Sequence, residues 1–321
     1  MTPLSDKTLY VLTGPTAVGK TEVALAWAER NNAEIVSCDS LLFYRGMDIG
    51  TAKPSKAERA RVPHHLIDLR DVTDGMDITT YVTLAQQAVN DIHQRGKRCL
   101  VTGGSGFYLK AFFAPVADDV VVAPELRAEI GAKLAEQGLP GLVAELRRLN
   151  PGGLGKLDTA NPRRVARALE RCYASGKTLE EMAEEFARQS GPFAEWTTKL
   201  TRLERTPADL EVRIRQRVDA MLSAGLVAEV ERLLAAGLKR NPSAARAIGY
   251  RETIDVLEGR LDRTNLAMTI AQNTKALVKK QRTWFRTQLP THRELDATEA
   301  REETIFGGIG HGGTEEYRGQ K

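Results

Sequence analysis

Residues 9–21, LYVLTGPTAVGKT, join a short apolar run to a loop that fits the pattern G-x-x-x-x-G-K-[ST] in every fixed position. A strand pattern precedes the loop, and residues 20–30 have the apolar spacing of a helix. In such a setting the backbone N–H groups of the loop turn inward and, with the helix N-terminus, surround phosphate oxygens. The stretch therefore predicts a phosphate-binding loop (P-loop) that holds a diphosphate or a triphosphate.

The expected phosphate ligands are the loop and the first residues of the following helix. Lys20 supplies a full positive charge, and the Thr21 hydroxyl suits coordination of Mg²⁺ as a cofactor. The predicted diphosphate-binding residues of this segment are Gly14, Pro15, Thr16, Ala17, Val18, Gly19, Lys20 and Thr21, with Thr21 as the metal ligand.

Apolar runs at residues 34–37 and 98–102 predict two further strands, with a helix around residues 81–95 between them. Strands that alternate with helices predict an α/β fold, in which a P-loop parallel sheet has helices on both faces and binds its ligands at the carboxyl edge. Residues 199–204 predict a strand that returns to this sheet.

The pattern changes near residue 114. Residues 115–199 show helical spacing and predict a helical insertion domain. The catalytic core is then discontinuous and consists of residues 1–114 and 200–305. Residues 306–321 carry several glycines among polar residues, which predicts a disordered tail.

Bulk composition narrows the class of protein. The chain of 321 residues is 42% hydrophobic and has a net charge of +4, which permits a nucleic-acid partner without requiring one. No stretch approaches the ~18 apolar residues of a membrane span, and the N-terminus lacks the sections of a signal peptide. We therefore expect a cytoplasmic protein without a membrane partner. The cysteines and histidines have the spacing of neither a disulfide framework nor a zinc site.

Missing acidic residues narrow the chemistry at the P-loop. The predicted third strand ends in Thr102-Gly103-Gly104, where many nucleotide hydrolases and kinases have a carboxylate that holds Mg²⁺. Asp39 is the one acidic residue that follows a predicted strand near the loop. The sequence thus indicates a P-loop used for something other than nucleotide hydrolysis.

Seven segments in order along the chain resemble the tRNA dimethylallyltransferase (tRNA isopentenyltransferase) family. They are GPTAVGKT (14–21), DSLLFYRGMDIGTAKP (39–54), VTGGSGFYLKA (101–111), PRRVARALE (162–170), LEVRIRQRVDAML (210–222), ARAIGYRE (245–252) and KKQRTWFR (279–286).

The resemblance implies the transfer of the dimethylallyl group of dimethylallyl diphosphate to N6 of the adenosine 3′-adjacent to the anticodon in tRNA, with release of diphosphate. The exocyclic amine of adenine is a poor nucleophile, so it needs a base to take its proton. By resemblance Asp39 has that role. The family's usual Gln, three residues after this Asp, is Leu42 here. We expect the enzyme to be a monomer.

Two further residues are candidates for catalysis. Thr206-Pro207 predicts a helix start, and Arg217 lies at the edge of that helix's apolar face, where it needs an anionic partner. A structural salt bridge would satisfy Arg217, but together with the resemblance a diphosphate contact is the better interpretation. Ser105 takes the place of the family's usual Thr and keeps a hydroxyl. This hydroxyl could contact substrate phosphate or tRNA, and the alternative is that Ser105 only stabilises the turn.

Two basic stripes predict contacts with tRNA phosphates, one on the insertion and one on the last long helix. Either stripe alone could be a solvated helix face. With the resemblance, the predicted tRNA-binding residues are Asp39, Ser40, Leu41, Leu42, Ser105, Arg127, Arg163, Arg164, Val165, Ala166, Arg167, Arg246, Gly249, Tyr250, Arg251, Lys279, Lys280, Arg282, Trp284 and Arg286.

Three alternatives remain open from sequence. The first is a small-molecule kinase that uses ATP, against which the missing acid and the basic stripes argue. The second is a non-catalytic, nucleotide-gated RNA-binding protein, in which Asp39 would be dispensable. The third is an isopentenyltransferase that acts on free AMP, which would have no use for the basic stripes.

Overall fold

The computed structural model describes residues 6–118 and 120–307. Two compact units divide the chain: one contains residues 1–114 and 191–321, and the other residues 115–190. The predicted insertion boundary at residue 199 is nine residues too late. Phe193 and Trp196 are buried in the core of the larger unit, so the chain has already rejoined it before the next strand begins.

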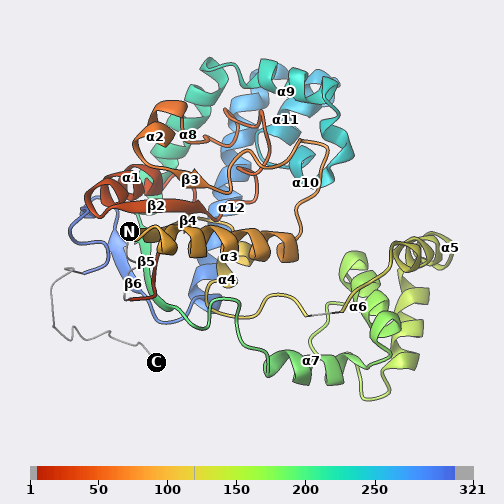
Figure 1. Cartoon of the computed structure of the whole chain (residues 1–321). Coiled ribbons are helices and arrows are strands. Elements are labelled where there is room, and N and C mark those ends of the chain that lie inside the picture. Colours follow the sequence, from red (N-terminus) through yellow and green to blue (C-terminus); the bar gives the residue numbers. More distant parts are fainter. Residues whose placement is uncertain (1–5, 119, 308–321) are drawn as a thin grey trace. The chain divides into compact units, whose positions relative to one another are not determined.

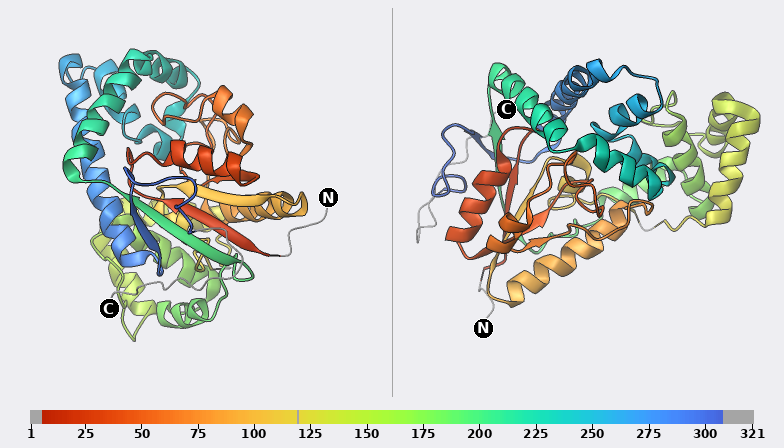
Figure 2. Two further views of the ribbon diagram at one scale, coloured as in Figure 1. Left: turned by 90° about the vertical axis from the view of Figure 1, so that its left-hand side faces the viewer. Right: turned by 90° about the horizontal axis from the view of Figure 1, so that it is seen from above.

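The larger unit is built on a parallel sheet of the order β3-β2-β4-β1-β5-β6 (Figure 1). Its strands are β1 Thr8–Thr13, β2 Ala33–Ser37, β3 His64–His65, β4 Arg98–Gly103, β5 Thr197–Glu204 and β6 Arg293–Asp296. Figure 2 shows β5 between β1 and β6. The predicted parallel P-loop sheet is confirmed, including the returning strand β5. The short strands β3 and β6 were not predicted.

Helices cover both faces of the sheet, as predicted. Their bounds in this unit are α1 Lys20–Arg30, α2 Lys56–Arg61, α3 Ile78–Gln94, α4 Gly106–Lys110, α8 Pro207–Ser223, α9 Leu226–Ala235, α10 Pro242–Ala245, α11 Tyr250–Leu257 and α12 Leu266–Gln288, with 3₁₀ turns at Leu238–Arg240 and Arg263–Asn265. The sheet has one hydrophobic core on each face, and alternate residues of β1 point into one or the other. Tyr10 and Leu12 pack with α1 and α8, whereas Leu9 and Val11 pack with α3. In Figure 1, α1 and α8 lie above the strands and α3 below them.

Helix α12 takes part in both cores, because Val278 packs on the α1 side of the sheet and Phe285 on the α3 side. This helix therefore passes the sheet and brings its middle turns to the edge at which β1, β2 and β4 end. Among the described residues, no helix is long and apolar enough to cross a membrane.

The start of the predicted disordered tail is ordered. Phe306 is buried and makes edge contacts with the rings of Tyr10 and Trp27. Its apolar ring covers the end of the α1-side core, which the glycine-rich composition after it does not indicate. Residues 308–321, the rest of that prediction, lie outside the described residues.

The smaller unit is helical, as the sequence indicated, and consists of α5 Pro124–Leu149, α6 Pro162–Ser175 and α7 Leu179–Ala187. Its core includes Ile130, Leu146 and Leu169. Helix α6 has a sequence-encoded start, since the Asn161 side chain accepts a hydrogen bond from the Arg164 N–H and Pro162 is the first helical residue.

Candidate active site

The P-loop connects the carboxyl end of β1 to the first turn of α1. Lys20 bends back over this loop, and its Nζ donates to the carbonyl oxygens of Gly14 (2.8 Å) and Pro15 (2.9 Å). Burial lowers the pKa of Lys20 to about 8, because a desolvated ammonium favours its neutral form. The negative charge of Asp39 raises this pKa and the positive charge of Arg217 lowers it, so the three groups lie within electrostatic range of one another.

Two arginines outside the predicted set hold the P-loop from the other side. Arg213 Nε of α8 donates to the Ala17 carbonyl at 2.8 Å, and Arg205 Nε donates to the Val18 carbonyl at 2.7 Å. Their contacts fix the backbone of the loop and add positive charge beside it. Arg213 precedes Arg217 by four residues, so the helical spacing of α8 already placed both on one face.

Arg217 reaches the site without a structural ion pair. Its Nη2 donates to the Thr51 carbonyl at 3.1 Å, and no carboxylate of the described residues forms a salt bridge with it. Burial lowers the pKa of Arg217, and the nearby charge of Asp39 partly offsets this effect. The structure therefore disfavours the salt-bridge alternative and leaves a partly desolvated cation available for an anionic ligand.

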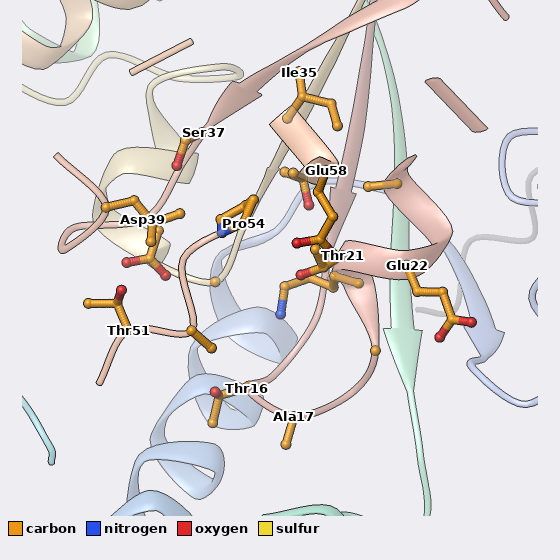
Figure 3. A pocket seen from close by; sticks show the side chains of 18 of the residues that line it. Thr16, Ala17, Thr21, Glu22, Ile35, Ser37, Asp39, Thr51, Pro54 and Glu58 are labelled. Carbon is orange, nitrogen blue, oxygen red and sulfur yellow. The ribbon is translucent and has the colours of Figure 1, made fainter. Parts of the chain in front are cut away.

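A cavity of about 530 Å³ lies over the P-loop and is called here the phosphate-side cavity. Lys20, Thr21, Arg213 and Arg217 line it, together with Asp39. Figure 3 shows the loop with Thr16 and Ala17 below this cavity, Asp39 and Thr51 on one side and Thr21 on the other. The cavity thus gathers several cations and P-loop residues, and the carboxylates Glu22, Asp39 and Glu58 also line it.

A second cavity, of about 500 Å³, is called here the α12-side cavity. Its apolar wall includes Ile248, Leu277 and Trp284, and its polar wall includes Ser40 and Ser105. These aromatic, aliphatic and hydroxyl groups suit a flat heteroaromatic ring, and the cations Arg246 and Lys280, which also line this cavity, suit phosphates attached to it.

The two cavities meet at a common boundary. The residues that line both are Thr16, Asp39, Thr51, Gly104, Arg217 and Gln281. Asp39 follows the carboxyl end of β2, and its Oδ1 accepts a hydrogen bond from the Leu41 N–H at 2.9 Å. A carboxylate that touches both cavities can act on a group that enters from the α12 side while an anion occupies the phosphate side.

Gln281 of α12 bridges the two glycine loops at this boundary. Its Oε1 accepts from the Thr16 N–H at 2.9 Å, and its Nε2 donates to the Gly104 carbonyl at 3.0 Å. The backbone approaches so closely that a Cβ on Gly104 would lie 2.8 Å from Gln281 Nε2. Gln281 was not among the predicted site residues, although it lies within the KKQRTWFR segment.

Ser105 supports the turn that carries Asp39. Its Oγ accepts from the Ser40 N–H at 3.0 Å and donates to Ser40 Oγ at 3.2 Å. Ser105 lines the α12-side cavity and is absent from the phosphate-side lining. Of the predicted roles, the structure therefore favours the tRNA side and the support of the turn over a phosphate contact.

This arrangement agrees with the comparison with known proteins. The family model described as IPP transferase matches residues 42–288, which is most of the chain. The chain belongs to the IPP transferase family. The fold class and the enzyme assignment made from sequence are therefore confirmed.

Relatives and solved structures in this family match over nearly the whole chain. A tRNA dimethylallyltransferase of Opitutus terrae is 65% identical over 92% of this chain and 94% of its own. The crystal structure of a Bacillus halodurans tRNA isopentenylpyrophosphate transferase has 32% identity and a TM-score of 0.66, and covers 91% of this chain and 90% of its own. A eukaryotic dimethylallyltransferase, described as acting on tRNA, has 25% identity and a TM-score of 0.78 over 94% of this chain and 76% of its own.

Several predicted tRNA-binding residues lie together at the α12-side cavity. They are Asp39, Ser40, Leu41, Ser105, Arg246, Lys280 and Trp284. Leu42 does not join them, because it lines the phosphate-side cavity while its neighbour Leu41 faces the other. The tRNA contact expected of Leu42 through its backbone stays a prediction. Lys279 and Arg286 are exposed on α12, and Arg251 is exposed at the start of α11.

Three predicted tRNA-binding residues of the larger unit have structural partners within the protein. Tyr250 is 0% exposed and donates its hydroxyl to Glu229, so its side chain is not available to RNA. The Gly249 N–H is buried and donates to Glu252. Arg282 binds Glu204 through Nη2 at 2.9 Å, which ties α12 to β5. The aromatic and basic character of these segments is thus explained largely by packing.

In the smaller unit, the predicted basic stripe is exposed. Arg163, Arg164 and Arg167 lie on the open face of α6, Ala166 is partly buried beside them, and Arg127 is exposed on α5. Val165 is fully buried in the helical core, so the tRNA contact predicted for it would have to come from its backbone. An apolar residue within a basic helix faces inward because of the helical period.

Proposed function

We propose that the phosphate-side cavity binds dimethylallyl diphosphate. The P-loop, residues 14–21, would hold the diphosphate through backbone N–H groups and Lys20, and Arg217 would contact it from α8. The supporting observation is the concentration of buried positive charge, since the pKa values of both Lys20 and Arg217 are lowered by desolvation. A bound anion offsets the free-energy cost of burying these two cations, because it gives each of them a partner of opposite charge.

Magnesium fits this cavity as a companion of the diphosphate. Among the described residues, no group of three or more His, Cys, Asp and Glu is placed to hold a metal by itself. The hydroxyl of Thr21 lines the cavity and can supply one oxygen ligand. Mg²⁺ keeps several waters and is commonly held by substrate phosphates with one or two protein oxygens, so this sparse donor set suits it. When bound, Mg²⁺ would neutralise charge on the leaving diphosphate.

The acceptor would be the adenosine adjacent to the anticodon on its 3′ side, with its base in the α12-side cavity. Its N6 attacks C1 of the dimethylallyl group, the C1–O bond breaks, and the diphosphate leaves with the bonding electron pair. Asp39 takes the proton that N6 loses. The single observation that carries this mechanism is that Asp39 lines both cavities at their boundary, where donor and acceptor must meet.

The protein residues supply the rest of the catalysis by charge and position. Lys20, Arg217 and the loop N–H groups stabilise the charge that builds on the departing diphosphate oxygens. Gln281 and Ser105 keep the two glycine loops and the Asp39 turn in place around the reacting groups. No carboxylate follows β4 at residues 103–105, where a nucleotide hydrolase would need one.

The tRNA would be held by the exposed basic residues of both units, and its target base would leave the anticodon stack to reach Asp39. We also propose that the enzyme acts as a monomer. Since tRNA is the proposed substrate, we place the enzyme in the cytoplasm.

A competition between acceptors tests this function. The enzyme is incubated with Mg²⁺, dimethylallyl diphosphate labelled in its prenyl group, and equal concentrations of unmodified tRNA and AMP. We expect the label in tRNA and not in AMP. Transfer to AMP would identify an isopentenyltransferase of free nucleotides. Phosphate transfer from ATP to a small-molecule acceptor, without any prenylation, would identify a kinase.

A further inference from the structure

Glu229 of α9 is a buried carboxylate that lines neither cavity and is 1% exposed. Its Oε2 accepts from the N–H groups of Asp48 (3.1 Å) and Ile49 (2.8 Å), and its Oε1 accepts from the N–H of Gly50 (3.1 Å). The Tyr250 hydroxyl donates to Oε1 at 2.6 Å. Among the described residues no cation pairs with Glu229, so these donors alone compensate its charge.

The aromatic ring of Tyr250 is the wall against which this loop rests. A Cβ on Gly50 would lie 2.5 Å from Tyr250 Cε2, so the backbone at residue 50 touches the ring and admits only a glycine. Tyr250 is itself fully buried. Glu229 and Tyr250 together therefore hold three consecutive backbone N–H groups in one arrangement, and hydrogen bonds to a buried charged acceptor are among the stronger ones.

The contacts of Glu229 and Tyr250 with residues 48–50 are called here the clasp. The next residue in the loop, Thr51, connects the clasp to the active site. Thr51 lines both cavities, and its carbonyl accepts the hydrogen bond from Arg217 Nη2. Lys53, whose side chain is 1% exposed, anchors the other end of the loop through Asp48 (2.8 Å) and the Tyr44 carbonyl (2.8 Å). Residues 48–53 are thus fixed by two buried charges of opposite sign, with Thr51 between them.

We propose that Glu229 is a positioning residue for the prenyl-transfer reaction, which acts through Thr51 on Arg217. The clasp holds the Thr51 carbonyl where it directs the guanidinium to the boundary of the two cavities, an inference that rests on the proposed diphosphate contact of Arg217. Without the clasp the loop backbone relaxes, the desolvated guanidinium loses its acceptor, and it no longer meets the diphosphate in one orientation.

A double-mutant cycle tests this coupling. We compare Glu229→Gln, Arg217→Ala and the double variant with the wild-type enzyme, at saturating tRNA and varied dimethylallyl diphosphate. Glu229→Gln should raise KM for the diphosphate about tenfold, the effect of losing one charge-assisted hydrogen bond. The dissociation constant for tRNA should stay within about twofold of wild type, because the clasp acts on the diphosphate site and not on the exposed basic residues. In the Arg217→Ala background, Glu229→Gln should change KM by less than about twofold, since the path through Arg217 is already removed.

The control variant is Glu34→Gln, which alters an equally buried carboxylate that contacts His65, Arg95 and Lys97 instead of the loop. It should lower Tm and leave KM unchanged. If Glu229→Gln does not fold, Tyr250→Phe keeps the ring and removes one donor. It should raise KM by about threefold in the wild-type background and not in Arg217→Ala.

Two results would overturn the inference. One is an equal factor on KM in both backgrounds, and the other is a lowered Tm with unchanged KM, as for Glu34→Gln. The first would show that Glu229 acts on KM by a route other than Arg217, and the second would assign Glu229 to stability alone. Failure of the wild-type enzyme to prenylate tRNA would instead overturn the proposed function, and the inference with it.

Discussion

Gln281 Oε1 accepts a hydrogen bond from the Thr16 N–H at 2.9 Å, and so joins the basic helix α12 to the P-loop. The other end of the same amide donates to the Gly104 carbonyl. One side chain therefore sets the spacing between the loop after β1 and the loop after β4, at the boundary of both cavities.

Gln281→Ala should lower kcat/KM about tenfold or more, because it leaves a partly buried N–H and a carbonyl without partners and lets the two loops move apart. The measurement is steady-state kinetics with both substrates varied. Gln288→Ala is the matched control, since Gln288 lies on the same helix, is exposed, and its amide donates to the Thr287 hydroxyl. Equal kinetics for the two variants would remove Gln281 from the site.

Lys20 should make diphosphate binding depend on pH. Its pKa of about 8 lies below the ordinary value of 10.5, so the ammonium loses its proton as the pH rises through about 8. Affinity for dimethylallyl diphosphate should be full below that pH and fall by up to about tenfold per unit above it. Lys20→Ala should bind weakly and without this decline. Calorimetric titration from pH 7 to 10 checks both, and an unchanged affinity in Lys20→Ala would contradict the phosphate-cradle assignment.

Asp39→Asn should preserve binding and abolish most of the chemistry. An amide keeps the size of the carboxylate but cannot take the N6 proton, so the rate should fall by about 10²–10⁴, the usual contribution of a general base. The affinity for tRNA should stay within a few-fold of wild type. Single-turnover prenylation and filter binding measure the two quantities. Near-normal turnover would exclude Asp39 from the mechanism and favour a protein that only binds RNA.

The basic stripes predict a salt-dependent interaction with tRNA. Replacing Arg163, Arg167 and Lys279 with Ala should weaken tRNA binding and flatten its dependence on salt, by up to ~0.7–0.9 log units of slope for each phosphate that is no longer neutralised. Binding of dimethylallyl diphosphate should not change, since the proposed site for it consists of other residues, among them Lys20, Thr21 and Arg217.

The control for the stripes removes the same charge elsewhere. Arg30, Lys239 and Arg260 are exposed and pair with nearby acids, so their replacement with Ala should leave the salt slope as it was. If the stripe variant binds tRNA normally at every salt concentration, the stripes are solvated faces and the tRNA surface lies elsewhere.

Much of the fold was predictable because local pattern and long-range packing agree. The P-loop motif fixed the end of β1 and the start of α1 at Lys20, and the alternation of apolar runs predicted β2, β4 and β5. The strands β3 and β6 have only two and four residues, so they carry no periodic signal of their own. Their pairing with β2 and β5 makes them strands.

The site was predictable where a residue type has few uses. Lys20 was found because a P-loop lysine is specific, whereas the role of Asp39 came from the family resemblance together with its place after a predicted strand near the loop. Tyr250 was misjudged because an aromatic residue beside arginines is equally typical of an RNA surface and of a buried ring. Glu229 carried a signal that was not used: it shares the buried face of α9 with Leu226 and Leu233, where an acid needs a special partner.

Prenyl transfer at Asp39, without nucleotide hydrolysis, is the central claim. The most direct measurement is mass analysis of the nucleosides of unmodified tRNA that has been incubated with the enzyme, Mg²⁺ and dimethylallyl diphosphate. We predict that one adenosine per tRNA, next to the anticodon on its 3′ side, gains the mass of one dimethylallyl unit, and that Asp39→Asn slows this gain. Adenosine of unchanged mass with the wild-type enzyme would contradict the claim.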